Sequence, residues 1–489
     1  MARRVSVSEL EQHSTKESVW LVVNEWVYDM TNFATEHPGG ADIIYQHAGR
    51  DASISYNEIH APSLIKKTLN EAEHVGILDR STAPEGWGTP VGQPQQLQRS
   101  SGDEKVPLDN IINLYDFEEV ARRTWPEKSW AYINGASNDN ITRDANSSIF
   151  QKIWLRPAIM RNVATVSSAT TLFGVQLDMP LYITPTGTAK TAGPEGELAL
   201  TKAASAKGSI LCMSTPTSFP HDEILAATPQ QAFFQLYVNK DRQKSEEAVR
   251  KAEATGKVKA LFVTVDLPVI SKREADERAK FDASTMNVKA GGMSATADRK
   301  GAGLARLNSS FIDSSLSWDD IAWLNRITKL PLVLKGIQRW EDAKLAQEHG
   351  LQGIVLSNHG GRAADTASPA IVTLLELHKN CPEVFDSMEV LVDGGIRRGS
   401  DVVKAVCLGA SAVGIGRPFL YANNYGQEGV EYAFDILRDE IHTAMQLCGL
   451  TDLMRDASAQ YVNTGEVDGL VRKGGHPYIR DRRRLKANL

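Results

Sequence analysis

The sequence contains few cysteines, and their spacing fits none of the common cysteine-based sites. Only four occur in 489 residues, namely Cys212, Cys381, Cys407 and Cys448. The absence of CxxC, CxxCH and zinc-ligand spacings argues against a disulfide framework, covalently attached c-type haem and structural zinc. Scattered thiols of this kind are typical of a protein from a reducing compartment.

Long apolar runs and an excess of positive charge are also missing. No hydrophobic stretch has the length of a bilayer span, so we expect no membrane-spanning segment. The net charge of −6 and the pI near 6.0 argue against nucleic acid as the main partner. The opening residues MARRVSVSEL lack the apolar core of a secretory signal and are too few for a mitochondrial presequence. We therefore expect a cytoplasmic location.

A stretch rich in Pro, Gly, Gln and Ser divides the chain into two unequal parts. A chain of this length is expected to form two or three domains, and residues 81–107 have the composition of a linker. We expect a small unit over residues 1–80 and a large unit over residues 108–460. A tail over residues 461–489, which carries a basic run near its end, would follow.

The large unit contains eight short apolar runs, most of them separated by amphipathic stretches. This alternation predicts a parallel sheet, and eight repeats predict a closed (β/α)8 barrel rather than an open doubly wound sheet. One crossover, about residues 271–317, lacks a sustained helical pattern and is predicted to be a mobile loop over the barrel mouth. The expected strands are Leu181–Pro185, Ile210–Ser214, Phe233–Val238, Leu261–Asp266, Leu332–Gly336, Gly353–Asn358, Val390–Asp393 and Ala412–Gly416.

Polar residues follow these runs at their carboxyl ends, which in a barrel form one mouth where active sites are built. After the sixth run, His359 could exchange a proton near neutral pH, and Arg362 could bind a carboxylate as a planar fork. This segment alone could equally be an ordinary strand-to-loop corner. The prediction of a site therefore depends on the whole set of polar residues at the strand ends: Thr186, Ser214, Gln235, Tyr237, Asp266, Lys335, His359, Asp393 and Arg417.

The loops after the seventh and eighth runs predict a phosphate site. Gly394, Gly395 and Gly416 would expose backbone N–H groups, and Arg397 and Arg417 would add positive charge. Surface Arg–Asp pairing is the alternative interpretation. No GxGxxG fingerprint follows an early strand, so a nicotinamide dinucleotide is not favoured and FMN, with one terminal phosphate, fits better.

Two histidines of the small unit predict a haem site. His37 and His60 each lie on a tight loop, and a pair of neutral imidazoles can ligate haem iron from both sides. Apolar residues such as Ile43 and Ile44 would form the walls of the pocket. On spacing alone, His47 competes with His60 as the second ligand.

The motifs together resemble known families over nearly the whole chain. The small unit resembles cytochrome b5 domains in His37-Pro-Gly-Gly and His60-Ala-Pro, and the large unit resembles the FMN-dependent 2-hydroxy-acid dehydrogenases and oxidases. The two units in this order resemble the flavocytochromes b2, which are fungal L-lactate:cytochrome c oxidoreductases, with an especially close match over Pro107–Glu118. The resemblance implies a small α+β haem domain followed by an α/β TIM barrel.

The resemblance also implies cofactors, partners and residue roles. The cofactors would be FMN and haem b, the substrate a 2-hydroxy acid, and the acceptor cytochrome c or another one-electron carrier. A homotetramer and a location in the mitochondrial intermembrane space are further implications. His359 matches the family's catalytic base, Asp266 its partner and Lys335 the cation near flavin N1. The catalytic set is His359, Asp266, Tyr132, Tyr237, Lys335, Arg362 and Arg273. The flavin set is Pro185, Thr186, Gly187, Ser214, Gln235, Thr264, Lys335, Asp393, Gly394, Gly395, Arg397, Gly416 and Arg417. The iron ligands are His37 and His60.

The sequence departs from the family pattern beside the expected substrate. Gly187 stands where the lactate enzymes commonly have alanine, and Pro216 stands where the family places a bulkier side chain. These changes predict an altered or larger pocket next to the substrate's C3, so the acid could be lactate, mandelate or a long-chain hydroxy acid. Two alternatives remain open: an oxidase that passes electrons to oxygen, and a haem electron carrier fused to an inactive barrel.

Overall fold

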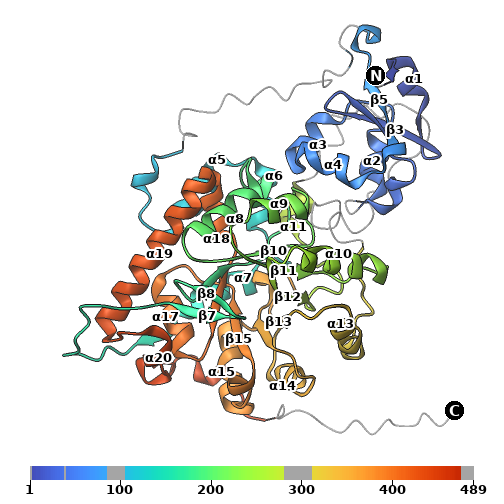
Figure 1. Cartoon of the computed structure of the whole chain (residues 1–489). Coiled ribbons are helices and arrows are strands. Elements are labelled where there is room, and N and C mark those ends of the chain that lie inside the picture. Colours follow the sequence, from blue (N-terminus) through green and yellow to red (C-terminus); the bar gives the residue numbers. More distant parts are fainter. Residues whose placement is uncertain (1–2, 38–39, 85–86, 88–104, 280–310, 475–489) are drawn as a thin grey trace, which may run out of the picture.

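The computed structural model describes residues 3–37, 40–84, 87, 105–279 and 311–474 (Figure 1). Most of the predicted linker, the central part of the predicted mobile loop and the basic end of the chain lie outside the described residues. The described residues form an N-terminal unit and a barrel unit, which lie against each other.

The N-terminal unit is built on a five-stranded sheet in the order β1-β5-β4-β3-β2. A hairpin joins β3 to β4 through Asn24 and Glu25, whose φ angles of 50° and 74° are those of a tight turn between strands. Because side chains alternate along a strand, Val19 and Leu21 of β3 pack on one face and Val22 on the other. The strands are β1 (Arg4–Val5), β2 (Ser14–Thr15), β3 (Ser18–Val23), β4 (Trp26–Asp29) and β5 (His74–Leu78).

Short helices cover both faces of this sheet. The first packs through Val7 and Leu10 against the face that holds Val22. The other three gather on the opposite face, and the two expected iron ligands border them: His37 follows a 3-10 turn, and His60 caps the end of α3. The helices are α1 (Val7–Gln12), α2 (Ala41–Gln46), α3 (Ser53–Ile59) and α4 (Pro62–Thr68).

The large unit contains a closed barrel of eight parallel strands, as the sequence predicts. Residues such as Tyr182, Phe233 and Phe262 fill its interior. The strand ends differ from the predicted ones by at most three residues. The strands are β9 (Leu181–Ile183), β10 (Leu211–Met213), β11 (Ala232–Leu236), β12 (Val258–Thr264), β13 (Leu332–Ile337), β14 (Gly353–Leu356), β15 (Glu389–Asp393) and β16 (Ala412–Ile415).

A small hairpin closes the amino-terminal end of the barrel. It consists of β7 (Thr170–Leu172) and β8 (Val175–Leu177), and Phe173 lies at its turn. The ring of Phe173 packs edge-on against Phe233 and Phe262, with centroids 5.7 and 6.0 Å apart. In the described residues this hairpin fills the amino-terminal end of the barrel and leaves the carboxyl ends of the strands as its open end.

Helices surround the barrel in the described parts of the chain, and none of them is long and apolar enough to cross a bilayer. The described part of the segment predicted as a mobile loop from residue 271 includes one short helix, α11, which is no sustained helical pattern, and the mobility of the segment stays a prediction. The helices are α5 (Leu114–Thr124), α6 (Glu127–Asn134), α7 (Ile141–Ser148), α8 (Gly196–Ala206), α9 (His221–Ala227), α10 (Arg242–Ala254), α11 (Glu274–Arg278), α13 (Ile321–Ile327), α14 (Trp340–Glu348), α15 (Ala370–Asn380), α16 (Val384–Ser387), α17 (Gly399–Cys407), α18 (Arg417–Ala422), α19 (Gly426–Cys448) and α20 (Leu453–Asp456).

The residues after the barrel pack back onto it. β17 (Val462–Asn463) pairs with β6 (Trp154–Leu155), and Val467 is fully buried. The first part of the segment predicted as a tail is thus a packed extension of the barrel unit. All four cysteines are buried and free.

Candidate active site and haem-binding pocket

His359 lies at the carboxyl end of β14 and has two polar partners. Its Nδ1 atom is 3.0 Å from a carboxylate oxygen of Asp266, and its Nε2 atom is 3.2 Å from the hydroxyl of Tyr237. Because Nδ1–H donates to the carboxylate, Nε2 carries the lone pair and accepts from the tyrosine. The ring is thus oriented as a base with Nε2 as the reacting atom.

Burial and neighbouring charges set the protonation state of His359. Burial lowers its pKa from 6.5, and the positive charges of Lys335 and Arg273 act in the same direction. The carboxylate of Asp266 opposes these effects, but the pKa remains below its usual value. The imidazole is therefore neutral near pH 7, as a general base must be.

Arg362 and Tyr132 meet above the barrel mouth. The Arg362 guanidinium donates to the backbone carbonyls of Tyr132 (3.0 Å), Ile133 and Gly135 (3.2 Å). Burial and the positive charge of Arg273 lower the pKa of Arg362 to about 10. The predicted substrate-binding residues Arg362, Tyr132 and Arg273 therefore interact with one another, and this buried positive charge favours an anion.

Lys335 forms a second buried pair beside the histidine. Its Nζ atom lies 3.0 Å from a carboxylate oxygen of Asp393 and 3.1 Å from the hydroxyl of Ser357. Burial alone would lower the pKa of Lys335, but attraction to Asp393 and Asp266 outweighs it and raises the pKa. The ammonium group therefore stays charged. Ser357, which sequence reasoning missed, also donates to Asp393 (2.6 Å) and accepts from the backbone N–H of His359 (3.0 Å).

Three of the predicted flavin residues form a ladder across neighbouring strands. The Ser214 hydroxyl donates to the Gln235 side-chain oxygen (3.1 Å), and the Gln235 amide donates to Thr264 (2.9 Å). All three side chains are buried. Their mutual hydrogen bonds fix the Gln235 amide near the carboxyl end of β11.

A cavity of about 390 Å³ adjoins the His359 site. Its walls include the backbone of Gly395, where a Cβ would fall 1.9 Å from a carbonyl oxygen, so only glycine fits there. The Thr186 hydroxyl is buried without a partner. The predicted flavin residues in the lining are Pro185, Thr186, Lys335, Asp393, Gly394, Gly395, Arg397, Gly416 and Arg417.

The charges around this cavity fit a phosphate. The Arg417 guanidinium donates to the carbonyls of Ile133, Gly135 and Gly360, and no carboxylate among the described residues pairs with it. Burial and the charge of Arg362 lower the pKa of Arg417 well below its usual value. A buried cation surrounded by other cations is stabilised by a bound anion, so the residues present fit the phosphate of FMN.

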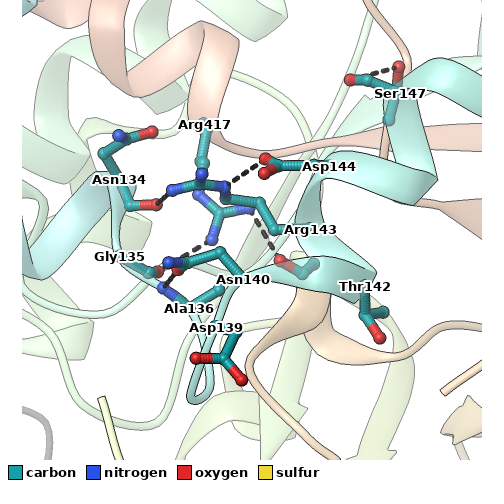
Figure 2. A network of polar contacts seen from close by, with 12 residues as sticks. Asn134, Gly135, Ala136, Asp139, Asn140, Thr142, Arg143, Asp144, Ser147 and Arg417 are labelled. Atoms are coloured by element: carbon teal, nitrogen blue, oxygen red, sulfur yellow. Dashed lines mark hydrogen bonds and ion pairs between the residues drawn. The ribbon is translucent and has the colours of Figure 1, made fainter. Parts of the chain in front are cut away.

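Arg143 is a further cation of this cavity that sequence reasoning missed. It donates to Asp144 (2.8 Å) and to the Asn134 carbonyl (3.2 Å), and Figure 2 shows its guanidinium next to that of Arg417. Its charge also depresses the pKa of Arg417. Arg143 lies on α7, before the first barrel strand, so the strand pattern gave no reason to consider it.

A second cavity, of about 1040 Å³, lies between the N-terminal unit and the barrel rim. The rings of His37 and His60 both border it, with centroids 6.3 Å apart. Two imidazoles this close at the edge of one cavity are the residues that would hold a haem iron. Ile43, Ile44 and other apolar side chains line the walls, which suits a porphyrin.

The protonation of the two histidines also suits iron ligation. His37 donates from Nδ1 to the Gly40 carbonyl (3.3 Å), which leaves Nε2 with its lone pair. Burial lowers the pKa of His37, and burial together with His37 and Lys190 lowers that of His60 to about 3. His47, the competing ligand, borders the same cavity, but the close ring pair is His37 with His60. These residues fit haem b.

Comparison with known proteins agrees with this geometry. Residues 121–463 match the family of FMN-dependent dehydrogenases, and residues 6–79 match the cytochrome b5-like haem/steroid-binding domains. The chain is 42% identical to L-lactate dehydrogenase (cytochrome) of Wickerhamomyces anomalus, over 91% of this chain and 77% of that protein. It is 41% identical to the protein of the same name from Saccharomyces cerevisiae, over 92% and 78%.

A solved structure of a flavocytochrome b2 variant with benzoylformate is also similar. The identity is 40%, the TM-score is 0.67, and the match covers 76% of this chain and 91% of that one. These similarities confirm the predicted fold class, the cofactors FMN and haem, and the assignment to the dehydrogenases. The chain belongs to the FMN-dependent dehydrogenase family and carries a cytochrome b5-like haem-binding domain at its N-terminal side.

Proposed function

We propose that this protein oxidises an L-2-hydroxy acid to the 2-keto acid and passes the electrons through its haem to cytochrome c or another one-electron acceptor. The observation that carries the proposal is the convergence of His359, Asp266, Tyr237 and Arg362 beside a cavity suited to FMN. A base, its counter-ion and a carboxylate-binding cation are the groups that this oxidation requires.

In the proposed reaction, Arg362 binds the carboxylate of the acid as a fork, with help from the hydroxyl of Tyr132. The substrate hydroxyl lies near Tyr237, and Nε2 of His359 takes a proton from the substrate. Asp266 stabilises the imidazolium that forms, because it is an opposite charge 3.0 Å from Nδ1. Arg273 adds positive charge on the same side of the substrate.

The cofactors supply the redox chemistry. When bound, FMN would supply two-electron acceptance and one-electron release, and haem would supply one-electron transfer. Pro185, Thr186 and the glycine-arginine loops would hold the FMN, and Lys335 would supply a positive charge at the flavin site. His37 and His60 would hold the haem iron.

Anaerobic mixing of the protein with a panel of 2-hydroxy acids tests the proposal. The flavin absorbance should bleach with the correct acid, and the haem should become reduced afterwards. A protein whose flavin no acid of the panel bleaches would instead be a haem carrier with an inactive barrel. In a parallel experiment with oxygen present, flavin reoxidation that outpaces haem reduction would identify an oxidase.

We propose further that the acid is larger than lactate. A Cβ on Gly187 would lie 3.1 Å from the Pro216 ring and 3.2 Å from its carbonyl oxygen, so Gly187 and Pro216 are fitted to each other. Pro216 also borders the cavity assigned to the haem, so the support for a larger acid is the small size of the Gly187 and Pro216 side chains themselves. The variant flavocytochrome b2 that holds benzoylformate illustrates that such a barrel accommodates an aromatic acid.

We also propose a homotetramer and a cytoplasmic location. Exposed apolar side chains such as Ile159 (82%), Met160 (99%) and Leu447 (70%) support association with further copies of the chain. The four buried free cysteines support a reducing compartment. Light scattering tests the first proposal, and cell fractionation distinguishes the cytoplasm from the mitochondrial intermembrane space.

A further inference from the structure

The loop that carries His60 contacts the barrel rim through its backbone. The Lys190 ammonium, from a 3-10 turn after β9, donates to the backbone carbonyls of Asn57 (2.7 Å) and His60 (2.9 Å). Next to it, the backbone N–H of Ala61 donates to the Ser218 carbonyl (2.9 Å). Three hydrogen bonds thus join the barrel to the residues around one expected iron ligand.

Hydrogen bonds within the barrel unit hold Lys190 and Ser218 in place. The fully buried carboxylate of Glu197, on α8, accepts from the backbone N–H groups of Ala189 (2.9 Å) and Ser218 (3.0 Å). The backbone N–H of Lys190 donates to the Ser218 hydroxyl (3.1 Å). One buried acid therefore holds both rim segments in the positions from which they contact the His60 loop.

The His60 loop is also held from within its own domain. The Tyr56 hydroxyl donates to the Ala61 carbonyl (2.9 Å) and accepts from the backbone N–H of Ile65 (2.8 Å). Hydrogen bonds on both sides therefore fix the backbone around His60. By contrast, the ion pair between Lys67 and Asp222 at the same interface is 45% and 68% exposed, so it contributes little.

We propose that Lys190 docks the haem domain, because its ammonium group binds the backbone carbonyls of Asn57 and His60 at the barrel rim and so sets the spacing between the haem and flavin sites. The Lys190 ammonium bonds backbone carbonyls and not the rings of His37, His60 or His359. It is therefore a positioning residue. The inference rests on the proposed function, in which electrons leave the flavin site through the haem. It predicts that Lys190 governs the second electron transfer and leaves the oxidation of the acid unchanged.

The test compares Lys190→Met, Lys190→Arg and, as a control at the same interface, Lys67→Met in the full-length protein with both cofactors. Stopped-flow spectroscopy follows flavin bleaching and haem reduction separately. In Lys190→Met, haem reduction should slow by about tenfold or more, because two hydrogen bonds to a charged donor are lost. Flavin bleaching should stay within about twofold, Lys190→Arg should recover part of the haem rate, and Lys67→Met should change neither.

Two readouts do not depend on turnover. The low-spin haem spectrum of Lys190→Met should match that of the parent protein, since both histidines remain. Its radius of gyration in small-angle scattering should increase, because the haem domain is no longer held at the rim. An unchanged haem-reduction rate with an unchanged radius, or a loss of flavin bleaching equal to the loss of haem reduction, would overturn the docking role. If even the parent protein failed to bleach with any acid, the proposed function would fail, and the scattering comparison would still decide the docking role.

Discussion

The Asp266 carboxylate lies 3.0 Å from Nδ1 of His359, and the Asp266 side chain is completely buried. Gly336 makes room for it, since a Cβ there would fall 2.5 Å from Asp266. The second carboxylate oxygen of Asp266 has no hydrogen-bond partner. A buried carboxylate with an unpaired oxygen lowers the stability of the folded protein. Once His359 has taken a proton, its positive charge attracts the Asp266 carboxylate and offsets part of this loss.

Replacement of Asp266 by asparagine tests the role of its negative charge while it keeps the shape of the side chain. In Asp266→Asn the volume is kept but the negative charge is lost, so the imidazolium is less stable and the pKa of His359 falls further. Flavin reduction by the substrate should slow by about 10²–10⁴-fold. The measurement is anaerobic flavin bleaching, and retained FMN absorbance shows that the variant folds. A rate near that of the parent would exclude a role for the charge.

Replacement of the proposed base, His359, should leave FMN bound. His359→Gln should give a folded, yellow protein whose turnover is lower by orders of magnitude, because Nε2 no longer takes the proton. His349→Gln serves as the matched control, since His349 stacks on Trp318 at the end of α14. Near-normal turnover of the His359 variant would assign the base elsewhere.

The pH dependence follows from the lowered pKa of His359. The pKa of His359 lies below 6.5 in the folded protein, mainly because of burial, so the acid limb of kcat/KM should have its midpoint below pH 6.5. The unfolded chain binds the proton at higher pH, so the same group lowers stability as the pH falls below 6.5. A pH–rate profile checks the first statement, and its acid limb should lie at still lower pH in Asp266→Asn.

The haem ligands are distinguished by a pair of alanine variants. His37→Ala should abolish the absorption of a low-spin b-type centre, whereas His47→Ala should keep it, because His37 and His60 form the close ring pair. Flavin bleaching by the substrate should persist in both variants. Loss of the low-spin spectrum in His47→Ala alone would reassign the second ligand.

The substitution Gly187→Ala, which adds one methyl group, tests the proposed preference for a larger acid. In Gly187→Ala the new Cβ would contact Pro216 at 3.1–3.2 Å and narrow the space beside the substrate. The ratio of kcat/KM for mandelate to that for lactate should fall by about tenfold or more. Gly469→Ala is the matched control, since a Cβ there meets nothing within 4 Å. An unchanged ratio would place the specificity elsewhere.

The eight-stranded barrel was predictable because each buried parallel strand appears in the sequence as a short continuous apolar run. The eight apolar runs gave the strands, and the residues that follow them, such as His359 and Lys335, gave most of the mouth. The segment Tyr132–Gly135 and Arg143 come from α6 and α7, outside the repeat, and reach the site only by long-range packing. Glu197 was equally hidden, because it lies inside a helix and acts through backbone groups of two distant turns.

Phe173 and the hairpin β7–β8 fill the amino-terminal end of the barrel, and the N-terminal unit lies at the opposite end. Within the described residues, the side of the barrel that binds the acid is therefore also the side that faces the haem-binding pocket. The acid and the proposed electron acceptor approach the flavin site from the same end of the barrel.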